Sequence, residues 1–165
     1  MHIRPYTGET DYTAVSNWIT DRRSHFLWCA GRFDYPLSQE NFYSVISRHA
    51  EEYGDVACMV VDEEGLPTGF FVYNINGESK AAFLKFVVLN NALRGKGLGR
   101  RMMSFIADYL FAEKNALSVG LVVFDVNTAA RRCYENAGFV LVSEESDAFT
   151  YENEKWGRCR MAKQR

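Results

Sequence analysis

The sequence predicts an α+β fold, in which a mixed, mostly antiparallel central sheet is flanked by helices within a single domain, residues 1–165. Three β-rich runs in the middle of the chain are separated only by short turn sequences, which indicates an antiparallel meander. Apolar residues recur at helical spacing before and after these runs. The length of 165 residues and the apolar content of 47% allow one substantial core.

The part of the chain before the meander is expected to be mainly helical. Residues 2–6 alternate weakly and predict a first strand, and residues 9–20 place their apolar side chains on one face of a helix. Ser38 is a typical N-cap for a second helix that extends to about residue 53. Residues 24–37 are rich in aromatic side chains without a clear period.

The meander and the second half supply the remaining elements. The meander strands are expected at residues 56–62, 69–76 and 81–89. The elements that follow are expected to be a helix at 98–114, a strand at 116–124, a helix at 127–137 and a strand pair at 139–142 and 158–161. Gly138 closes the second of these helices, because glycine readily takes the left-handed backbone that ends a helix.

Composition excludes several classes of protein. The net charge is −2, and only residues 94–101 form a basic cluster, so a nucleic-acid binder is not expected. The four cysteines have no Cys-x-x-Cys spacing and the three histidines are scattered, which predicts no metal site and no disulfide framework. The first twenty residues contain Glu9 and Asp11, and no run approaches about 18 apolar residues. We therefore expect a reduced, cytoplasmic protein that does not enter a membrane.

The most informative stretch is a glycine-rich basic loop between a predicted strand and a predicted helix. The unpaired N–H groups at a helix N-terminus already carry about half a positive charge, so cations there are unfavourable unless an anion binds. Alternating glycines let a bulky anion approach the backbone. A phosphate or pyrophosphate would resolve the conflict. The cations are Arg94, Lys96, Arg100 and Arg101, and the glycines are Gly95, Gly97 and Gly99.

Two common phosphate-binding motifs do not match this loop. A P-loop requires a Ser or Thr directly after its lysine, whereas Lys96 is followed by Gly97. A dinucleotide fingerprint requires a third glycine where this chain has Met102. A nucleoside triphosphatase and a Rossmann enzyme are therefore disfavoured.

A second stretch of interest lies at residues 125–139. Asn127 stands at the expected N-cap of a helix, and Tyr134 follows seven residues later, two turns along the same face. Each residue alone has an ordinary structural explanation, since asparagine often caps helices and a helical tyrosine often belongs to the core.

Together the two stretches resemble the GNAT superfamily of acyl-CoA-dependent N-acyltransferases. The family's phosphate loop, Arg/Gln-x-x-Gly-x-Gly/Ala, is matched by Arg94, Gly97 and Gly99. The resemblance covers roughly residues 56–143. The family's distal signature is matched by Asn127, Ala130, Tyr134, Glu135, Gly138 and Phe139.

The resemblance implies an acetyl-CoA-dependent N-acetyltransferase that acts on a primary amine of a small molecule, a protein N-terminus or a lysine. Acetyl-CoA would be a co-substrate, no metal would be needed, and Tyr134 would protonate the departing thiolate. The CoA-binding residues implied in this way are Val87, Val88, Leu89, Arg94, Gly95, Lys96, Gly97, Leu98, Gly99, Arg100, Asn127 and Tyr134.

Four features stay open. Some family members deprotonate the amine with a glutamate on the strand before or after the phosphate loop, but the corresponding residues 81–89 and 121–124 contain no carboxylate. The base is therefore a water chain or a more distant group; such groups are Glu78, Asp34, His25 and Tyr73. The resemblance implies an acceptor side at residues 24–37 and a loop at 144–156, whose aromatic and acidic side chains would suit a cationic amine. The alternative for these acids is an ordinary solvated hairpin. The alternatives to an enzyme are a non-catalytic acyl-CoA sensor and a nucleotide-binding regulatory domain. The oligomeric state, a homodimer included, is not determined by the sequence.

Overall fold

The computed structural model describes all 165 residues and contains one seven-stranded sheet in the order β1-β2-β3-β4-β5-β7-β6. Neighbouring strands β4 and β5 are parallel, whereas β1/β2, β2/β3, β5/β7 and β6/β7 are antiparallel, which confirms the predicted mixed, mostly antiparallel sheet. The elements are β1 His2–Pro5, α1 Gly8–Trp18, α2 Arg22–Cys29, α3 Gln39–Tyr53, β2 Val56–Val61, β3 Pro67–Ile75, β4 Ala81–Leu89, the short 3-10 helix η1 Asn91–Leu93, α4 Leu98–Glu113, β5 Ser118–Phe124, α5 Thr128–Asn136, β6 Val140–Tyr151 and β7 Glu154–Gln164.

The chain divides into two compact units. The N-terminal unit comprises Met1–Asn74 and Lys85–Lys96, and the C-terminal unit comprises Ile75–Leu84 and Gly97–Arg165. Strands β3 and β4 each run through both units. The glycine-rich loop is divided too, because the boundary falls between Lys96 and Gly97.

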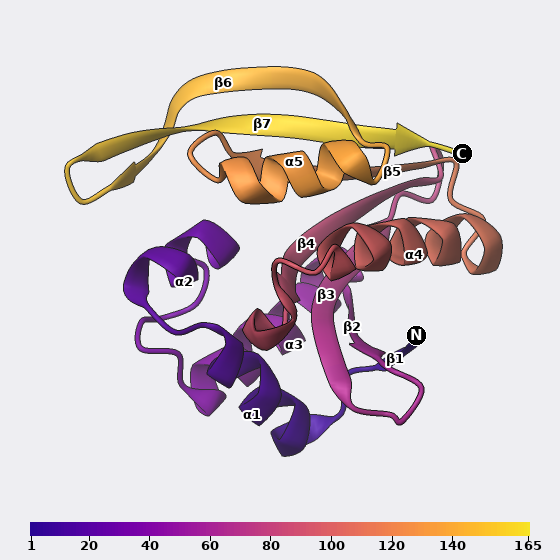
Figure 1. Cartoon of the computed structure of the whole chain (residues 1–165), viewed down its shortest axis with the longest axis horizontal. Helices are drawn as coiled ribbons and strands as arrows, with labels where there is room; N and C mark the ends of the chain where they lie inside the picture. Colours follow the sequence, from indigo (N-terminus) through magenta and orange to yellow (C-terminus); the bar gives the residue numbers. More distant parts are fainter. The chain divides into compact units, whose positions relative to one another are not determined.

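The N-terminal unit contains helices α1, α2 and α3 together with strands β1, β2 and most of β3 (Figure 1). Its core combines helix residues such as Val15 and Phe42 with strand residues such as Met59 and Phe70, all fully buried. The apolar face predicted for each of the first and third helices therefore faces the sheet. Ser38 is the N-cap of α3 and its hydroxyl accepts a hydrogen bond from Asn41 N at 3.2 Å, as predicted.

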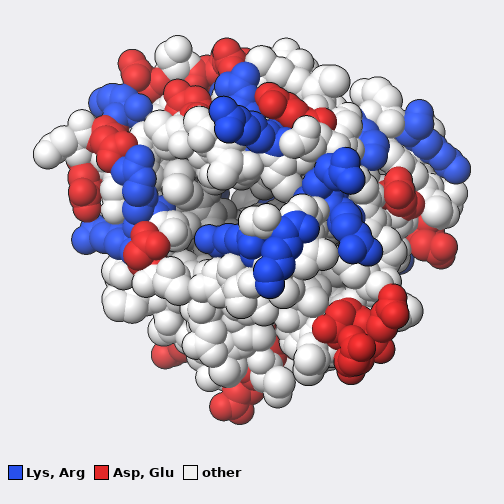
Figure 2. All heavy atoms as spheres, viewed as in Figure 1, with Lys and Arg blue, Asp and Glu red and all other residues white.

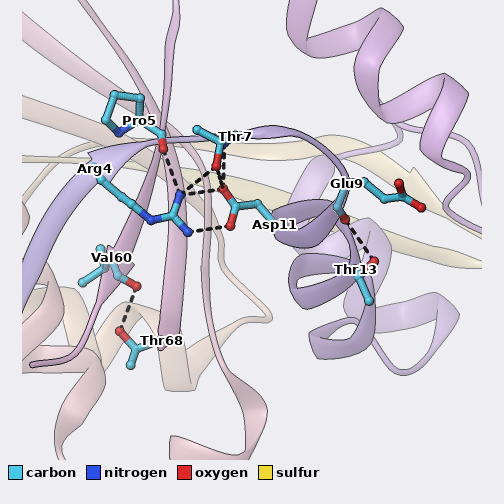
Figure 3. Close-up of polar contacts among 8 residues, drawn as sticks. All are labelled: Arg4, Pro5, Thr7, Glu9, Asp11, Thr13, Val60 and Thr68. Carbon is cyan, nitrogen blue, oxygen red and sulfur yellow. Dashed lines mark hydrogen bonds and ion pairs between the residues drawn. The ribbon is translucent and has the colours of Figure 1, made fainter. Parts of the chain in front are cut away.

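An ion pair between a partly exposed arginine and a buried carboxylate connects β1 to α1 (Figure 3). Arg4 donates from Nη1 and Nη2 to the two carboxylate oxygens of Asp11 at 2.7 and 2.6 Å, and Thr7 N donates to Asp11 Oδ2 at 2.7 Å. Burial alone would raise the pKa of Asp11, but the hydrogen bonds from Arg4 and Thr7 outweigh it and lower that pKa below its usual range. The pair therefore holds an ionised carboxylate that is 1% exposed.

Helix α2 was not predicted. Its N-cap is Asp21, whose side chain accepts a hydrogen bond from Ser24 N at 2.9 Å, and it ends at Ala30 in the left-handed conformation. Its apolar residues are consecutive rather than spaced at three and four, so the sequence has no helical period. The two residues that it buries are one turn apart and include a histidine, His25, together with Cys29.

In the C-terminal unit, helices α4 and α5 lie against each other and β5 pairs with β7 along its whole length. The predicted strand pair at 139–142 and 158–161 is wrong in length, because β6 and β7 form a hairpin from Val140 to Gln164 (Figure 1). Most of the expected loop at 144–156 is therefore strand. The sequence of β6 has no apolar alternation along most of its length, because β6 is an edge strand whose first eight residues are exposed.

Charges of both signs are interspersed over the face that Figure 2 shows, in keeping with a net charge of −2. No helix of the structure combines the length and the apolarity that a membrane span requires.

Candidate active site

Strand β4 contributes backbone groups to the predicted site from the N-terminal unit. Its parallel ladder with β5 begins at Ala81, opposite Ser118, and ends at Phe83, opposite Gly120. Phe86 follows with a φ of 50°, which is unusual for a residue with a bulky side chain inside a strand. The N–H and C=O groups of Val87 and Leu89 come after this irregularity, outside that ladder. They are therefore placed on a strand segment that can pair with an extended ligand.

The loop after β4 has an open, glycine-dependent backbone. Gly95 has a φ of 77° and Gly97 a φ of 73°, a region that other residues adopt at a cost. A Cβ added at either glycine would meet no atom within 4 Å. Glycine is therefore required for the backbone conformation and not by crowding, and the space beside the loop is available to a ligand.

Helix α4 begins without the usual means of satisfying its first N–H groups. Its N-cap is Gly97, which has no side chain to accept a hydrogen bond, and its first turn contains no acid. The backbone N–H of Arg101, which bonds Gly97 O at 3.3 Å, is the first to be paired within the helix. The N–H groups before it remain available to an anion, as at other helix N-termini.

The cations of the loop have no partners within the chain. Arg94, Lys96, Arg100 and Arg101 are exposed and form no ion pair. Other cations of this protein, such as Arg4 and Lys85, are paired with buried carboxylates. The four loop cations are thus uncompensated beside an uncapped helix, which is the electrostatic situation that the sequence predicted.

Asn127 is the N-cap of α5, as predicted. Its Oδ1 accepts a hydrogen bond from Ala130 N at 3.3 Å, and its backbone N–H bonds Phe124 O at 2.9 Å. The side-chain NH₂ forms no hydrogen bond within the chain. One half of the amide therefore stabilises the helix, and the other half is available as a donor.

Tyr134 lies on the same helix, two turns after its N-cap. The ring packs against Phe139 at a centroid distance of 6.2 Å, while the hydroxyl forms no hydrogen bond within the chain. Burial of the side chain, together with the neighbouring Cys133, raises the pKa of this phenol above its ordinary value. The hydroxyl is therefore protonated at neutral pH and has no competing acceptor.

The C-terminal unit brings the two sequence motifs into one structure, because α4 and α5 lie against each other there. Its share of the predicted residues comprises Gly97, Leu98, Gly99, Arg100, Asn127 and Tyr134. The N-terminal unit holds the others, Val87, Val88, Leu89, Arg94, Gly95 and Lys96.

The sequence model of the acetyltransferase (GNAT) family matches residues 12–139, which include both motifs. The chain belongs to the acetyltransferase (GNAT) family. The family implies acetyl-CoA as the co-substrate. Within the C-terminal unit, the uncapped start of α4 and its exposed Arg100 and Arg101 have the chemistry that suits a phosphate group.

Solved structures of related architecture agree with this assignment of the fold. A spermidine N-acetyltransferase from Vibrio cholerae, in complex with CoA and spermine, superposes with a TM-score of 0.81 at 21% identity and covers 99% of this chain and 94% of its own. The spermidine/spermine N-acetyltransferase SpeG from Vibrio cholerae, in complex with manganese ions, gives a TM-score of 0.74 at 19% identity, with 99% and 91% covered.

The expected acceptor side of the acetyltransferase differs from its sequence-based description. Glu144 is paired with Arg131 at 3.1 Å, and Glu145 lies opposite Arg158 in the β6/β7 ladder. These acids therefore have cationic neighbours and do not form a free acidic rim. Trp28 stacks on Phe33 at 4.9 Å within the core of the N-terminal unit, so these aromatic rings pack inside the protein.

The groups named as candidate bases in the acetyltransferase have different surroundings. Glu78 and Asp34 are exposed on turns, whereas Tyr73 and His25 are buried. His25 Nε2 donates a hydrogen bond to Phe33 O at 3.0 Å, and the buried Nδ1 has no partner within the chain. None of the four is singled out by its placement.

The sequence interpretation missed a buried polar cluster beside β4. Asp55 bonds Lys85 through both carboxylate oxygens at 2.8 Å and also contacts His49 and Asn74. One signal was present in the sequence, since Lys85 is the only charged residue in the apolar strand β4. A charge in such a strand must find a buried partner, but the sequence does not identify that partner.

Proposed function

We propose that this acetyltransferase transfers the acetyl group of acetyl-CoA directly to the primary amine of a small molecule, a protein N-terminus or a lysine, without a covalent enzyme intermediate. The observation that carries the proposal is the pairing of α5 with α4. Helix α5 presents Asn127 and the uncommitted hydroxyl of Tyr134, and α4 begins at the open glycine loop. Acetyl-CoA would use both: the glycine loop for its pyrophosphate, and Asn127 with Tyr134 for its pantetheine arm and thioester.

Each part of the co-substrate has a proposed set of partners in the chain. Arg94 and the backbone from Gly95 to Arg100 bind the pyrophosphate, where N–H groups and cations act together. The free amide NH₂ of Asn127 donates to the pantetheine arm. The backbone of Val87, Val88 and Leu89 pairs with the same arm as a strand would.

The proposed reaction has one bond-forming and one bond-breaking step. The neutral acceptor amine attacks the thioester carbon, and a backbone N–H of β4 stabilises the oxyanion that develops. The carbon–sulfur bond then breaks, and Tyr134 donates its proton to the CoA thiolate. The former amine nitrogen releases its surplus proton to water, and water returns a proton to the Tyr134 phenolate. Burial raises the pKa of the Tyr134 phenol, so the hydroxyl carries the proton that this step requires.

Polyamines are the first acceptors to test, because a protein of similar fold was solved in complex with CoA and spermine. Purified protein should be mixed with acetyl-CoA and a panel of polyamines, amino acids and peptides, and free thiol followed together with product mass. Transfer to at least one amine supports the proposal. Tight CoA binding with no transfer to any amine would favour a non-catalytic acyl-CoA sensor. Such a sensor would have no use for Tyr134 as an acid.

Calorimetry with CoA and with ATP tests the nature of the phosphate ligand. We expect CoA to bind well and ATP to compete weakly, because Asn127 and the backbone of β4 contact parts that ATP lacks. Equal affinity for both ligands would support a nucleotide-binding regulatory domain and contradict the enzyme.

We further propose that residues 1–165 act as one N-acetyltransferase domain, since β3 and β4 are shared by both units. The four cysteines are free thiols, which fits a reducing cytoplasm. Neither nucleic acid nor a membrane is a proposed partner. A homodimer is compatible with the proposal, and light scattering coupled to size-exclusion chromatography would detect it.

A further inference from the structure

A carboxylate is buried at the centre of the N-terminal unit and is fully hydrogen-bonded. The side chain of Asp55 is 2% exposed. Lys85 Nζ donates to both of its oxygens at 2.8 Å, Asn74 Nδ2 donates to Oδ1 at 2.8 Å, and His49 Nδ1 donates to Oδ2 at 3.0 Å. All four acceptor positions of the carboxylate are therefore used.

This cluster joins four elements of the unit. His49 belongs to α3, Asn74 to the end of β3 and Lys85 to the middle of β4, while Asp55 directly precedes β2. Lys85 Nζ also lies 4.9 Å above the ring of Tyr53. The amino group of Lys85 is thus held from several sides, so the backbone of β4 is anchored at that residue.

The anchored residue is next to the irregular position of β4. In a regular strand, neighbouring side chains point to opposite faces. Here Lys85 binds Asp55, which also bonds His49, and the ring centroid of Phe86 lies 5.5 Å from that of His49. Both side chains thus approach the His49–Asp55 pair, and the φ of 50° at Phe86 departs from the extended backbone of a regular strand. Phe86 is held in turn by Phe33, at a centroid distance of 4.9 Å.

We propose that Lys85 and Asp55 are positioning residues, which hold the irregular backbone of β4 so that the N–H groups after Phe86 are aimed at the thioester carbonyl. The inference rests on the proposed function, since it assigns the pair a task in acetyl transfer. Two side-chain anchors, the amino group of Lys85 and the ring of Phe86, fix the strand directly before the peptide unit that carries the N–H of Val87. An N–H that stabilises an oxyanion must be held in this way before the reaction begins.

The test compares two ion pairs of the same unit, each with a buried carboxylate. Lys85→Met keeps an unbranched side chain of similar reach but removes the bonds to Asp55. The matched control, Asp11→Asn, weakens the Arg4 pair, whose contacts lie on β1, α1 and the connection between them and not on β4. Both variants should lower the melting temperature. Only Lys85→Met should lower kcat, by about 10- to 100-fold, with a change of less than about threefold in CoA affinity.

A spectroscopic measurement separates positioning from a loss of stability. A ketone analogue of acetyl-CoA, with a methylene in place of sulfur, has a carbonyl infrared band that moves to lower frequency when an N–H bonds it. In the wild type and in Asp11→Asn we expect the lowered frequency. In Lys85→Met the band should return toward its position in water, and Lys85→Arg should restore part of the shift.

Several outcomes would overturn the inference. Equal losses of kcat in Lys85→Met and Asp11→Asn would reduce the cluster to a stabilising role, as would an unchanged ketone band in Lys85→Met. If Lys85→Met does not fold, the double variant Asp55→Asn/Lys85→Met, which buries no charge, takes its place with the same expectations. A wild-type protein that binds the ketone analogue but acetylates no amine would contradict the proposed function. In that case the carbonyl band of the bound ketone still tests whether Lys85 positions the N–H groups of β4.

Discussion

Asn127 caps the helix that carries Tyr134: its Oδ1 accepts a hydrogen bond from Ala130 N at 3.3 Å, and Tyr134 lies two turns further along the same face. The cap and the proposed acid therefore move as one rigid element. Because Oδ1 is used within the helix and the NH₂ is not, the two roles of Asn127 can be separated by mutation.

Replacing Tyr134 by phenylalanine should lower kcat by about 10²- to 10⁴-fold, because the ring packing on Phe139 is kept and only the proton donor is lost. CoA affinity, measured by calorimetry, should change little. Tyr109→Phe on α4 is the matched control, since it removes a hydroxyl from another helical tyrosine. An unchanged kcat in Tyr134→Phe would remove this residue from the proposed reaction.

Two substitutions of Asn127 should differ in their effects. Asn127→Ala removes the cap, which costs about 1 kcal/mol of stability, and also the free donor. Asn127→Asp keeps a capping oxygen but has no NH₂ and should weaken CoA binding with little loss of stability. Melting temperatures and CoA dissociation constants check both expectations. Equal CoA affinity for Asn127→Asp and the wild type would contradict the proposed contact with the pantetheine arm.

Gly97→Ala should weaken CoA binding, because alanine at a φ of 73° is strained by about 1 kcal/mol and shifts the start of α4. Gly54→Ala is a suitable control, since Gly54 ends α3 with a φ of 66° and has equally open surroundings. The two variants should lose similar stability in urea unfolding. A similar loss of CoA affinity in both would argue against a role for the loop in binding.

The Arg4–Asp11 pair should make the free energy of unfolding depend on pH. The pKa of Asp11 is lower in the folded chain than its ordinary 3.8, so the unfolded state binds a proton first as the pH falls. The contribution of Asp11 is complete above about pH 5 and is lost as the pH falls through its folded pKa. Urea unfolding at pH 7, 5, 4 and 3 should therefore show the advantage of the wild type over Asp11→Asn shrinking toward acid. A constant difference would contradict an ionised Asp11.

Elements with a clear period or a recognisable cap were predicted well from the sequence. The helix after Ser38 and the helix from Leu98 begin where expected, and β4 has the predicted bounds. Helix α2 was missed because its apolar residues are consecutive. Hairpin β6/β7 was predicted too short, because an edge strand needs no apolar face and can carry exposed acids such as Glu144 and Glu145.

In the candidate site too, some parts follow from the local sequence and others from the tertiary structure. The glycine loop and the cap of α5 consist of residues within a few positions of one another, so the local sequence by itself determines their backbone conformation. The partners of single charges were decided only by the tertiary structure. Asp55 and Lys85 are thirty residues apart, and Glu144 reaches Arg131 only because β6 returns past α5. Asp55 is buried and therefore requires a partner, whereas Glu144 is exposed; in both cases the folded sheet decides which cation lies within reach.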